Sequence, residues 1–227
     1  MPARVADRGQ GSDAGDHLDR AVAELPRTRG VQLSTTMSHS RSRLFGPSTG
    51  GLRFSADYAP VARPDHDQAL QQTTRLDYRT ERFGGLWAGL TWRYDSGLVA
   101  VAVRRISDAF ALSGDDQAAM GLFCGSVFAT IDQPIRGCDG AAGATRLRIP
   151  APGTEDDDVN PTRLAPRHLV DVNGGLDAVH IMKMPVRLRV SVVNLFNRVA
   201  LYNFLSTFSG THFVTPRAVT AEIGVRF

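Results

Sequence analysis

Hydrophobic and polar residues alternate along several stretches of the chain, with the period of two that a half-buried β-strand requires. The last nine residues show this pattern most clearly. Every second position there is apolar or aromatic: Val219, Ala221, Ile223, Val225 and Phe227. The positions between them hold Thr220, Glu222, Gly224 and Arg226. The pattern therefore predicts a strand with one apolar face and one polar face.

Similar runs elsewhere predict an antiparallel meander of about eight strands. They cover residues 30–40, 50–59, 68–79, 86–94, 97–106, 167–178, 186–195 and 217–227. The tripeptide Asp95-Ser96-Gly97 is a tight-turn signal between two of these runs. We therefore expect segments 86–94 and 97–106 to form a hairpin. Residues 1–29 are polar and mixed in charge, and we expect them to be a poorly ordered lead-in.

The connections between these strands fall into two groups when they are counted back from the C-terminus. The loops near 41–49, 80–85, 107–166 and 196–216 fall at one end of the strands. The connections near 60–67, 95–97 and 179–185 fall at the other end. The first group contains both of the longest loops, and the second contains only short turns. Outer-membrane barrels have this asymmetry, with long extracellular loops and short periplasmic turns.

The overall composition agrees with strands that cross a membrane. Hydrophobic residues make up 42% of the chain and the mean hydropathy is -0.16. The sequence contains no run of about 20 apolar residues, which a spanning helix needs. Barrel strands average to near-neutral hydropathy because their two faces alternate. We predict an all-β fold in which residues 30–227 form part of a transmembrane β-barrel, with a long extracellular loop at about 107–166.

Other classes of protein find little support in the sequence. The 26 basic and 23 acidic residues are scattered, so the basic stripe of a nucleic-acid-binding protein is missing. No catalytic motif, cofactor-binding loop or set of zinc ligands is visible. The run Asp156–Asp158 lacks the spacing of a calcium loop and is interpreted as a solvated acidic tip. We therefore assign no catalytic, cofactor-binding or metal-binding residues.

The two cysteines, Cys124 and Cys138, flank a segment rich in glycine, serine and proline. Their spacing suits a disulfide and two free thiols equally well. An outer-membrane protein folds in an oxidising compartment, which favours the disulfide. The first residues contain no apolar segment typical of an export signal. We therefore expect the chain to be a fragment, a mis-called start or the remnant of a longer gene.

The C-terminal stretch Asn194–Phe227 resembles the end of TonB-dependent outer-membrane receptors. The resemblance rests on Asn194, Leu195, Asn197, Tyr202, Asn203, Pro216, Arg217 and Phe227. The segment Trp87–Val103 looks like a hairpin from the barrel of the same family. In outer-membrane barrels, a final apolar strand with a C-terminal aromatic residue is the signal that the barrel-assembly machinery recognises by strand addition. Here this implies an assembly signal at Val219, Ala221, Ile223, Val225 and Phe227.

The resemblance also implies a function for the intact protein. Receptors of this family have about 22 strands around a plug domain. They take up a small nutrient molecule with energy passed through TonB, which contacts the N-terminal part that this chain lacks. The expected partners here are the outer-membrane bilayer, the assembly machinery and an unknown ligand. The aromatic residues Phe196, Tyr202, Phe204, Phe208 and Phe213 are expected either near the membrane interface or packed under the last loop, and the sequence does not separate the two. The alternative is a self-contained eight-stranded barrel with a structural or adhesive role, in which the first and last strands would pair.

Overall fold

The computed structural model describes residues 17–28, 30–45, 48–49, 52–53, 61–65, 67–181, 184–206 and 209–225. These residues are mostly antiparallel β-sheet, with short helices in the connections. The fold is therefore all-β, as the alternation predicts. Among the described residues, no helix has both the length and the apolar composition needed to cross a membrane.

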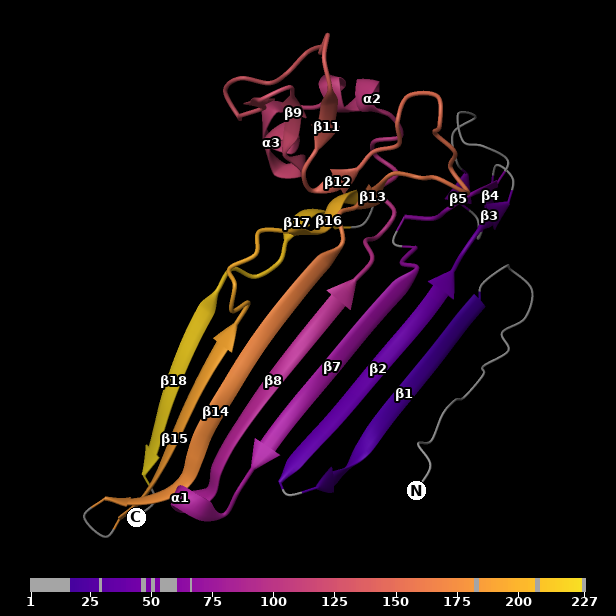
Figure 1. Ribbon diagram of the computed structural model, residues 1–227. Coiled ribbons are helices and arrows are strands. Elements are labelled where there is room, and N and C mark those ends of the chain that lie inside the picture. Colours follow the sequence, from indigo (N-terminus) through magenta and orange to yellow (C-terminus); the bar gives the residue numbers. More distant parts are fainter. Residues whose placement is uncertain are drawn as a thin grey trace.

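One large sheet contains seven strands that are neighbours in the order in which they occur along the chain. These are β1 (His17–Thr28), β2 (Val31–Arg41), β7 (Leu70–Arg79), β8 (Leu86–Asp95), β14 (Arg167–Ile181), β15 (Met184–Val193) and β18 (Ala218–Val225). Every adjacent pair is antiparallel. The strands form one curved layer (Figure 1). In the described part of the chain, no pairing joins β1 to β18, so the sheet is open.

The first strand corrects the prediction of a poorly ordered lead-in over residues 1–29. Residues 17–28 pair with β2 along almost their whole length, and Gly30 lies in the turn between the two strands. Ala21 and Ala23 are opposite Met37 and Thr35. Both alanines are small, so their alternation is weak in the sequence. The sheet continues to this strand because β2 offers it a free edge.

The segment 97–106 is not a strand, and the predicted hairpin is wrong. Strand β8 pairs with β7 and β14 instead. After Asp95 the chain leaves the sheet, and Val99, Ala100 and Val103 are buried outside it. The backbone at Gly97 has a φ of 99°, and a Cβ there would lie 2.0 Å from the carbonyl oxygen of Leu164. The apolar run is therefore part of a core and contributes no face to the sheet.

The predicted strand at 50–59 falls largely outside the described residues. Its described part is β5 (Leu52–Arg53), which pairs with β4 (Ser48–Thr49) apart from the large sheet. Nearby, β3 (Leu44–Phe45) pairs with β6 (Val61–Ala62). Residues 42–69 are thus a single connection between β2 and β7.

These changes move three connections but strengthen the asymmetry of the loops. The long connections 42–69, 96–166 and 194–217 all lie at one end of the sheet. The short connections 29–30, 80–85 and 182–183 lie at the other end, where 80–85 includes α1 (Arg82–Gly85). The segments 60–67 and 95–97 therefore belong to the long-loop end, and 80–85 to the short-turn end. The predicted ends of these three connections are therefore exchanged, because β2 pairs directly with β7 and β8 pairs directly with β14.

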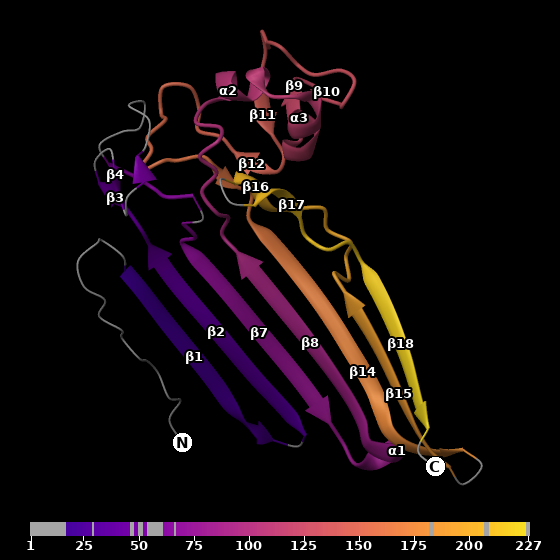
Figure 2. The same cartoon turned by 180° about the vertical axis from the view of Figure 1, so that it is seen from behind.

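The connection 98–166 folds into a compact cap together with the hairpin of β16 (Leu201–Ser206) and β17 (Gly210–Phe213), as Figure 2 shows from behind. We call this unit the cap. Its other elements are α2 (Ile106–Ala111), α3 (Gly114–Met120), β9 (Leu122–Cys124), β10 (Val127–Phe128), β11 (Ala142–Ala144), β12 (Leu147–Arg148) and β13 (Arg163–Leu164). Its core includes Val103, Met120, Leu122, Leu164 and Phe204, each at most 2% exposed. The predicted long loop is thus a folded unit with its own core.

Candidate membrane-facing surface

The strand register aligns apolar side chains across the sheet. One row crosses six strands through Leu33, Leu76, Leu90, Val172, Val192 and Val219, and the backbone register continues it to position 25 of β1. A parallel row crosses six strands through Val31, Tyr78, Ala88, Gly174, Val190 and Ala221. A third links Leu86, Leu176, Leu188 and Ile223. Together these rows make up what we call the apolar face.

No layer of secondary structure covers this face within the described residues. Leu90 is 38% exposed, Val190 is 49% exposed and Ile223 is 72% exposed. The face is about 30 Å wide, because seven strands lie about 4.8 Å apart. Water-soluble monomers rarely expose contiguous apolar patches larger than a few hundred Å². A face of this extent is typical of a surface that contacts a membrane or another protein.

The opposite face of the sheet is polar and carries ion pairs, some between neighbouring strands and one, between β7 and β14, across the intervening β8. Arg93 on β8 donates to Asp171 on β14 at 2.7 Å, and Arg79 on β7 pairs with Asp177 on β14. Arg189 and Glu222 lie 3.9 Å apart across β15 and β18. Charged groups of opposite sign on facing strands stabilise a sheet and keep their charges paired. This polar face therefore suits water or packed protein and would be costly in hydrocarbon.

Gly89 leaves space on this face for the polar side chains of Asn173 and Asp77. A Cβ at Gly89 would lie 2.3 Å from Oδ1 of Asn173 and 3.0 Å from Oδ1 of Asp77. The two side chains come from the strands on either side, β14 and β7. The glycine thus makes room for polar contacts that any larger residue would displace.

An aromatic cluster marks the cap end of the apolar face. The ring of His168 stacks on Trp92 with centroids 5.9 Å apart, and it contacts Tyr94 at 4.8 Å. Trp92 and Tyr94 continue the apolar face along β8, beyond Leu90. Amphipathic rings at one end of an apolar band are typical of a membrane interface. Sequence reasoning missed this cluster because its members come from two strands far apart in the chain.

The aromatic residues predicted for the interface have different roles. Phe204 is 2% exposed and belongs to the core of the cap. The Tyr202 ring lies 4.9 Å from the guanidinium carbon of Arg167, and Phe213 lies near Arg146. Phe196 is exposed in the connection before β16, whereas Phe208 lies outside the described residues. The interface placement is therefore wrong for Phe204, which packs inside the cap because β16 covers α3 there.

The final strand carries four of the five residues assigned to the assembly signal. Val219, Ala221, Ile223 and Val225 are opposite Val192, Val190, Leu188 and Val186 of β15. They all lie on the apolar face. Phe227 lies outside the described residues. The other edge of β18 has no strand partner in the described part of the chain, so its backbone groups on that side are free to pair with an added strand.

The asparagines of the C-terminal motif fix the two ends of the connection 194–217. Asn194 is 2% exposed, and its Nδ2 donates to the carbonyl oxygens of Arg198 and Thr215 at 3.0 and 2.9 Å. The Oδ1 of Asn197 accepts from the backbone N–H of Arg217 at 3.0 Å. Both asparagines have a positive φ, near 50°, which asparagine tolerates better than most residues. Their side chains and their backbone conformation together explain why this motif needs asparagine.

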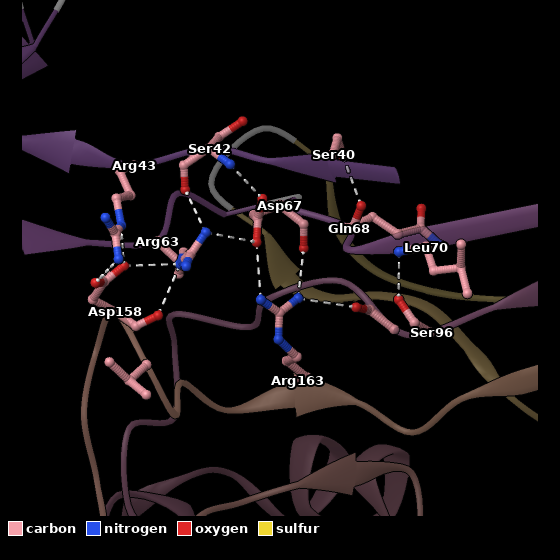
Figure 3. A network of polar contacts seen from close by, with 12 residues as sticks. Ser40, Ser42, Arg43, Arg63, Asp67, Gln68, Leu70, Ser96, Asp158 and Arg163 are labelled. Atoms are coloured by element: carbon pink, nitrogen blue, oxygen red, sulfur yellow. Dashed lines mark hydrogen bonds and ion pairs between the residues drawn. The ribbon is translucent and has the colours of Figure 1, made fainter. Parts of the chain in front are cut away.

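A buried ion-pair network ties the long connections together at the rim of the sheet (Figure 3). The side chain of Asp67 is 1% exposed and accepts from Arg163 Nη2 at 2.9 Å and from the backbone N–H of Ser42 at 2.8 Å. Arg63 lies 3.9 Å from Asp67 and also pairs with Asp158 at 3.0 Å. Burial lowers the pKa of Arg63, and the charge of Arg41 acts in the same direction. The network joins 42–69 to the cap.

The prediction of a solvated tip at Asp156–Asp158 holds for Asp156, which is exposed, and is wrong for Asp157 and Asp158, which are partly buried in ion pairs. Asp158 pairs with Arg43 and Arg63, and Asp157 pairs with Arg104. Asp156 accepts from the backbone N–H groups of Asp158 and Val159 at 2.8 and 2.7 Å, and these hydrogen bonds lower its pKa. Asp158 therefore holds the cap to the connection 42–69, whereas Asp157 is paired within the cap and Asp156 caps its own turn. Within the described residues there is no group of three or more potential ligands that could hold a metal ion.

The structure contains a disulfide between Cys124 and Cys138, at the tip of the cap. It closes a loop with a sequence separation of 14. Cys124 ends β9, which pairs with both β10 and β11, so the bridge ties the far end of this loop to the cap's small sheet. Phe123 and Phe128 also contact each other across β9 and β10, with ring centroids 5.8 Å apart.

Loss of this disulfide should loosen the cap and leave the large sheet intact. We expect the double variant Cys124→Ser/Cys138→Ser to lower the free energy of cap unfolding by about 2–3 kcal/mol, because a cross-link restricts the unfolded loop. Backbone amide exchange at Phe123 and Ala129 would measure the change. Amides of β8 and β14 serve as the control. Equal loss of protection in the sheet would contradict the assignment of the disulfide to a separate unit.

Comparisons with protein-family models, with curated proteins and with solved structures gave no match.

Proposed function

We propose that this chain is the C-terminal part of the barrel of a TonB-dependent outer-membrane receptor. The intact receptor would bind a scarce nutrient outside the cell and import it with energy passed through TonB. The observation that carries the proposal is the apolar face, which spans the sheet without a covering layer. Hydrocarbon is the partner that matches such a face, while the paired charges of Arg93 and Asp171 suit an enclosed polar interior.

The arrangement of the connections supports the same proposal. The cap and the two other long connections lie at one end, and three short connections lie at the other. In outer-membrane barrels the long loops are extracellular and carry the ligand contacts. The cap would then stand on the outer side, where the ligand arrives, and its disulfide would form in an oxidising compartment.

The open sheet favours a receptor over a self-contained small barrel. The alternative requires the first and last strands to pair, and the sheet has no such pairing between β1 and β18 in the described residues. Seven strands make up about a third of a 22-stranded barrel. In a bilayer, unpaired edges cost several kcal/mol for each unsatisfied backbone group, so both edges need neighbours there. The barrel-assembly machinery would supply the first contact at the free edge of β18.

Nitroxide labels on β15 would test this proposal. The chain would carry an added export signal, a single cysteine label at Val190 or Ser191, and serine in place of Cys124 and Cys138. These neighbours lie on opposite faces of the sheet. We expect the Val190 label to collide with lipid-soluble oxygen and the Ser191 label to collide with a water-soluble nickel chelate. Equal nickel accessibility at both labels in the membrane-bound chain would refute the membrane assignment.

A further inference from the structure

A basic cavity lies where the last long connection passes the base of the cap. It has a volume of about 280 Å³ and is lined by Thr145, Arg146, 165–168 and 198–201. One of these lining residues, His168, stacks its ring on Trp92 of the apolar face. The cavity is therefore next to the cap end of that face. It contains three arginines whose charges are balanced to different degrees.

Two of these arginines have no carboxylate partner among the described residues. Arg167 pairs with Asp95 at 2.6 Å, so its charge is balanced. Arg146 donates through Nη1 to the carbonyl oxygens of Ala118 and Ala119, both at 3.0 Å, at the end of α3. These contacts fix the guanidinium in place and leave its charge uncompensated. The Arg198 side chain is exposed and makes no hydrogen bond or ion pair within the described part of the chain.

The excess charge and the chemistry of the guanidinium group select an anion with several oxygens. A guanidinium presents several N–H donors in a planar fork, which matches the geometry of phosphate. Arg146 is held by the helix end, so it loses little conformational freedom on binding. Because Arg198 lies on the connection fixed by Asn194, its backbone is also held in position. Both arginines line the cavity, so a phosphate group bound there would not displace an existing ion pair of either.

An apolar groove lies further along the same strand, with no lining residue in common with the cavity. It has a volume of about 390 Å³, and its lining includes Val172, Gly174, Leu188 and Val190. Gly174 contributes no side chain to the apolar face, so the sheet is hollowed there. His168 and Gly174 are six residues apart on β14, about 20 Å along the strand. With a strand tilt of about 45°, this is a depth of about 14 Å, close to one leaflet of a hydrocarbon core about 30 Å thick.

We propose that the cavity binds the phosphate headgroup of an anionic lipid whose acyl chain lies in the groove over Gly174. This inference rests on the proposed membrane function, because the groove meets lipid only if the apolar face does. The two features match the two parts of one lipid. The arginines without carboxylate partners would bind the charged headgroup at the interface, and the open apolar groove would hold the acyl chain at the depth of one leaflet. The lipid would occupy the outer surface of the sheet, on the side of the cap.

Fluorescence quenching by brominated lipids tests the site. The chain has two tryptophans, and Trp87→Phe leaves Trp92, which stacks on His168, as the reporter. The full chain would be reconstituted in phosphatidylcholine containing a small fraction of brominated phosphatidic acid, or the same fraction of brominated phosphatidylcholine. We expect at least about tenfold preferential binding of phosphatidic acid, since each charge-assisted hydrogen bond contributes about a factor of ten.

Arginine variants assign the preference to the cavity. Arg146→Ala/Arg198→Ala should abolish it, and Arg198→Ala alone should reduce it about tenfold without removing any side-chain contact within the described protein. Arg75→Ala/Arg187→Ala removes the same charge from the polar face and should leave the preference unchanged. Preference that survives the first variant, or falls equally in the control, overturns the site.

Two further outcomes separate this inference from the membrane proposal. Equal quenching by the two brominated lipids would reject the headgroup site while leaving the membrane assignment standing. Absence of quenching by both would reject the two proposals together. Competition with inorganic phosphate distinguishes a site for a lipid headgroup from a site for a soluble anion. Displacement of the lipid by free phosphate at a concentration equal to that of the lipid would identify a site for soluble anions and overturn the lipid assignment.

Discussion

Replacing Val190 with arginine should destabilise the bilayer-embedded protein by about 2–4 kcal/mol, the cost of a basic residue at the lipid-facing midplane of a barrel. Val190 lies in the middle of β15 on the apolar face and is 49% exposed, without a covering layer. In a bilayer its side chain would meet hydrocarbon. In water the same change would cost little, because an exposed arginine is readily hydrated.

Denaturant titration in phospholipid vesicles measures this effect as the free energy of unfolding. Ser191→Arg is the matched control, because it places the same charge one residue away on the polar face. We expect that variant to change the free energy of unfolding by less than about 1 kcal/mol. A Val190→Arg variant as stable as Ser191→Arg would show that the apolar face does not meet lipid.

Asp67→Ala should be the most damaging single substitution at the rim, with a loss of about 3–5 kcal/mol in the stability of the cap attachment. The carboxylate is 1% exposed and faces Arg163 at 2.9 Å and Arg63 at 3.9 Å. Its removal takes the carboxylate partner from Arg163, leaves the buried Arg63 with Asp158 alone, and leaves the N–H of Ser42 without its acceptor. The cost comes from these unpaired groups.

Amide exchange at Val99 and Ala100 measures the loss, because these N–H groups bond to the carbonyls of Asp67 and Thr162 across the same rim. Asp67→Asn should lose less, since it keeps an acceptor for Ser42. Glu222→Ala removes a carboxylate from an exposed pair that is 3.9 Å apart, and should cost less than about 1 kcal/mol. Similar losses for Asp67→Ala and Glu222→Ala would contradict the buried network.

Alternation in the sequence was sufficient to predict the strands whose two faces meet different surroundings. Strands β15 and β18 alternate along most of their length, as does the middle of β14 from Val170 to Leu176, and each has one apolar and one polar face in the sheet. The method failed where side chains are small, as at Ala21 and Ala23 of β1. It also failed at 97–106, because a run that is apolar on both sides fits a core segment as well as a strand.

The cap and the rim could not be predicted because they depend on contacts between distant residues. Asp158 pairs with Arg43 across 115 positions, and Phe204 packs with Met120 in one core. The local sequence around Asp156–Asp158 is that of an exposed tip, and only the fold brings arginines to it. The same holds for the stacking of His168 on Trp92, which requires β8 and β14 to be neighbours.

Among the described residues, the buried hydrophobic core lies almost entirely in the cap. The cap and the sheet are therefore stabilised by different surroundings. The cap excludes water from its own interior and is stable in an aqueous surrounding. The sheet has no interior and gains its apolar contacts only from whatever covers it. Detergents that replace a bilayer would therefore act on the sheet. Urea at moderate concentration would first unfold the cap. The molecule as a whole therefore has no single melting temperature.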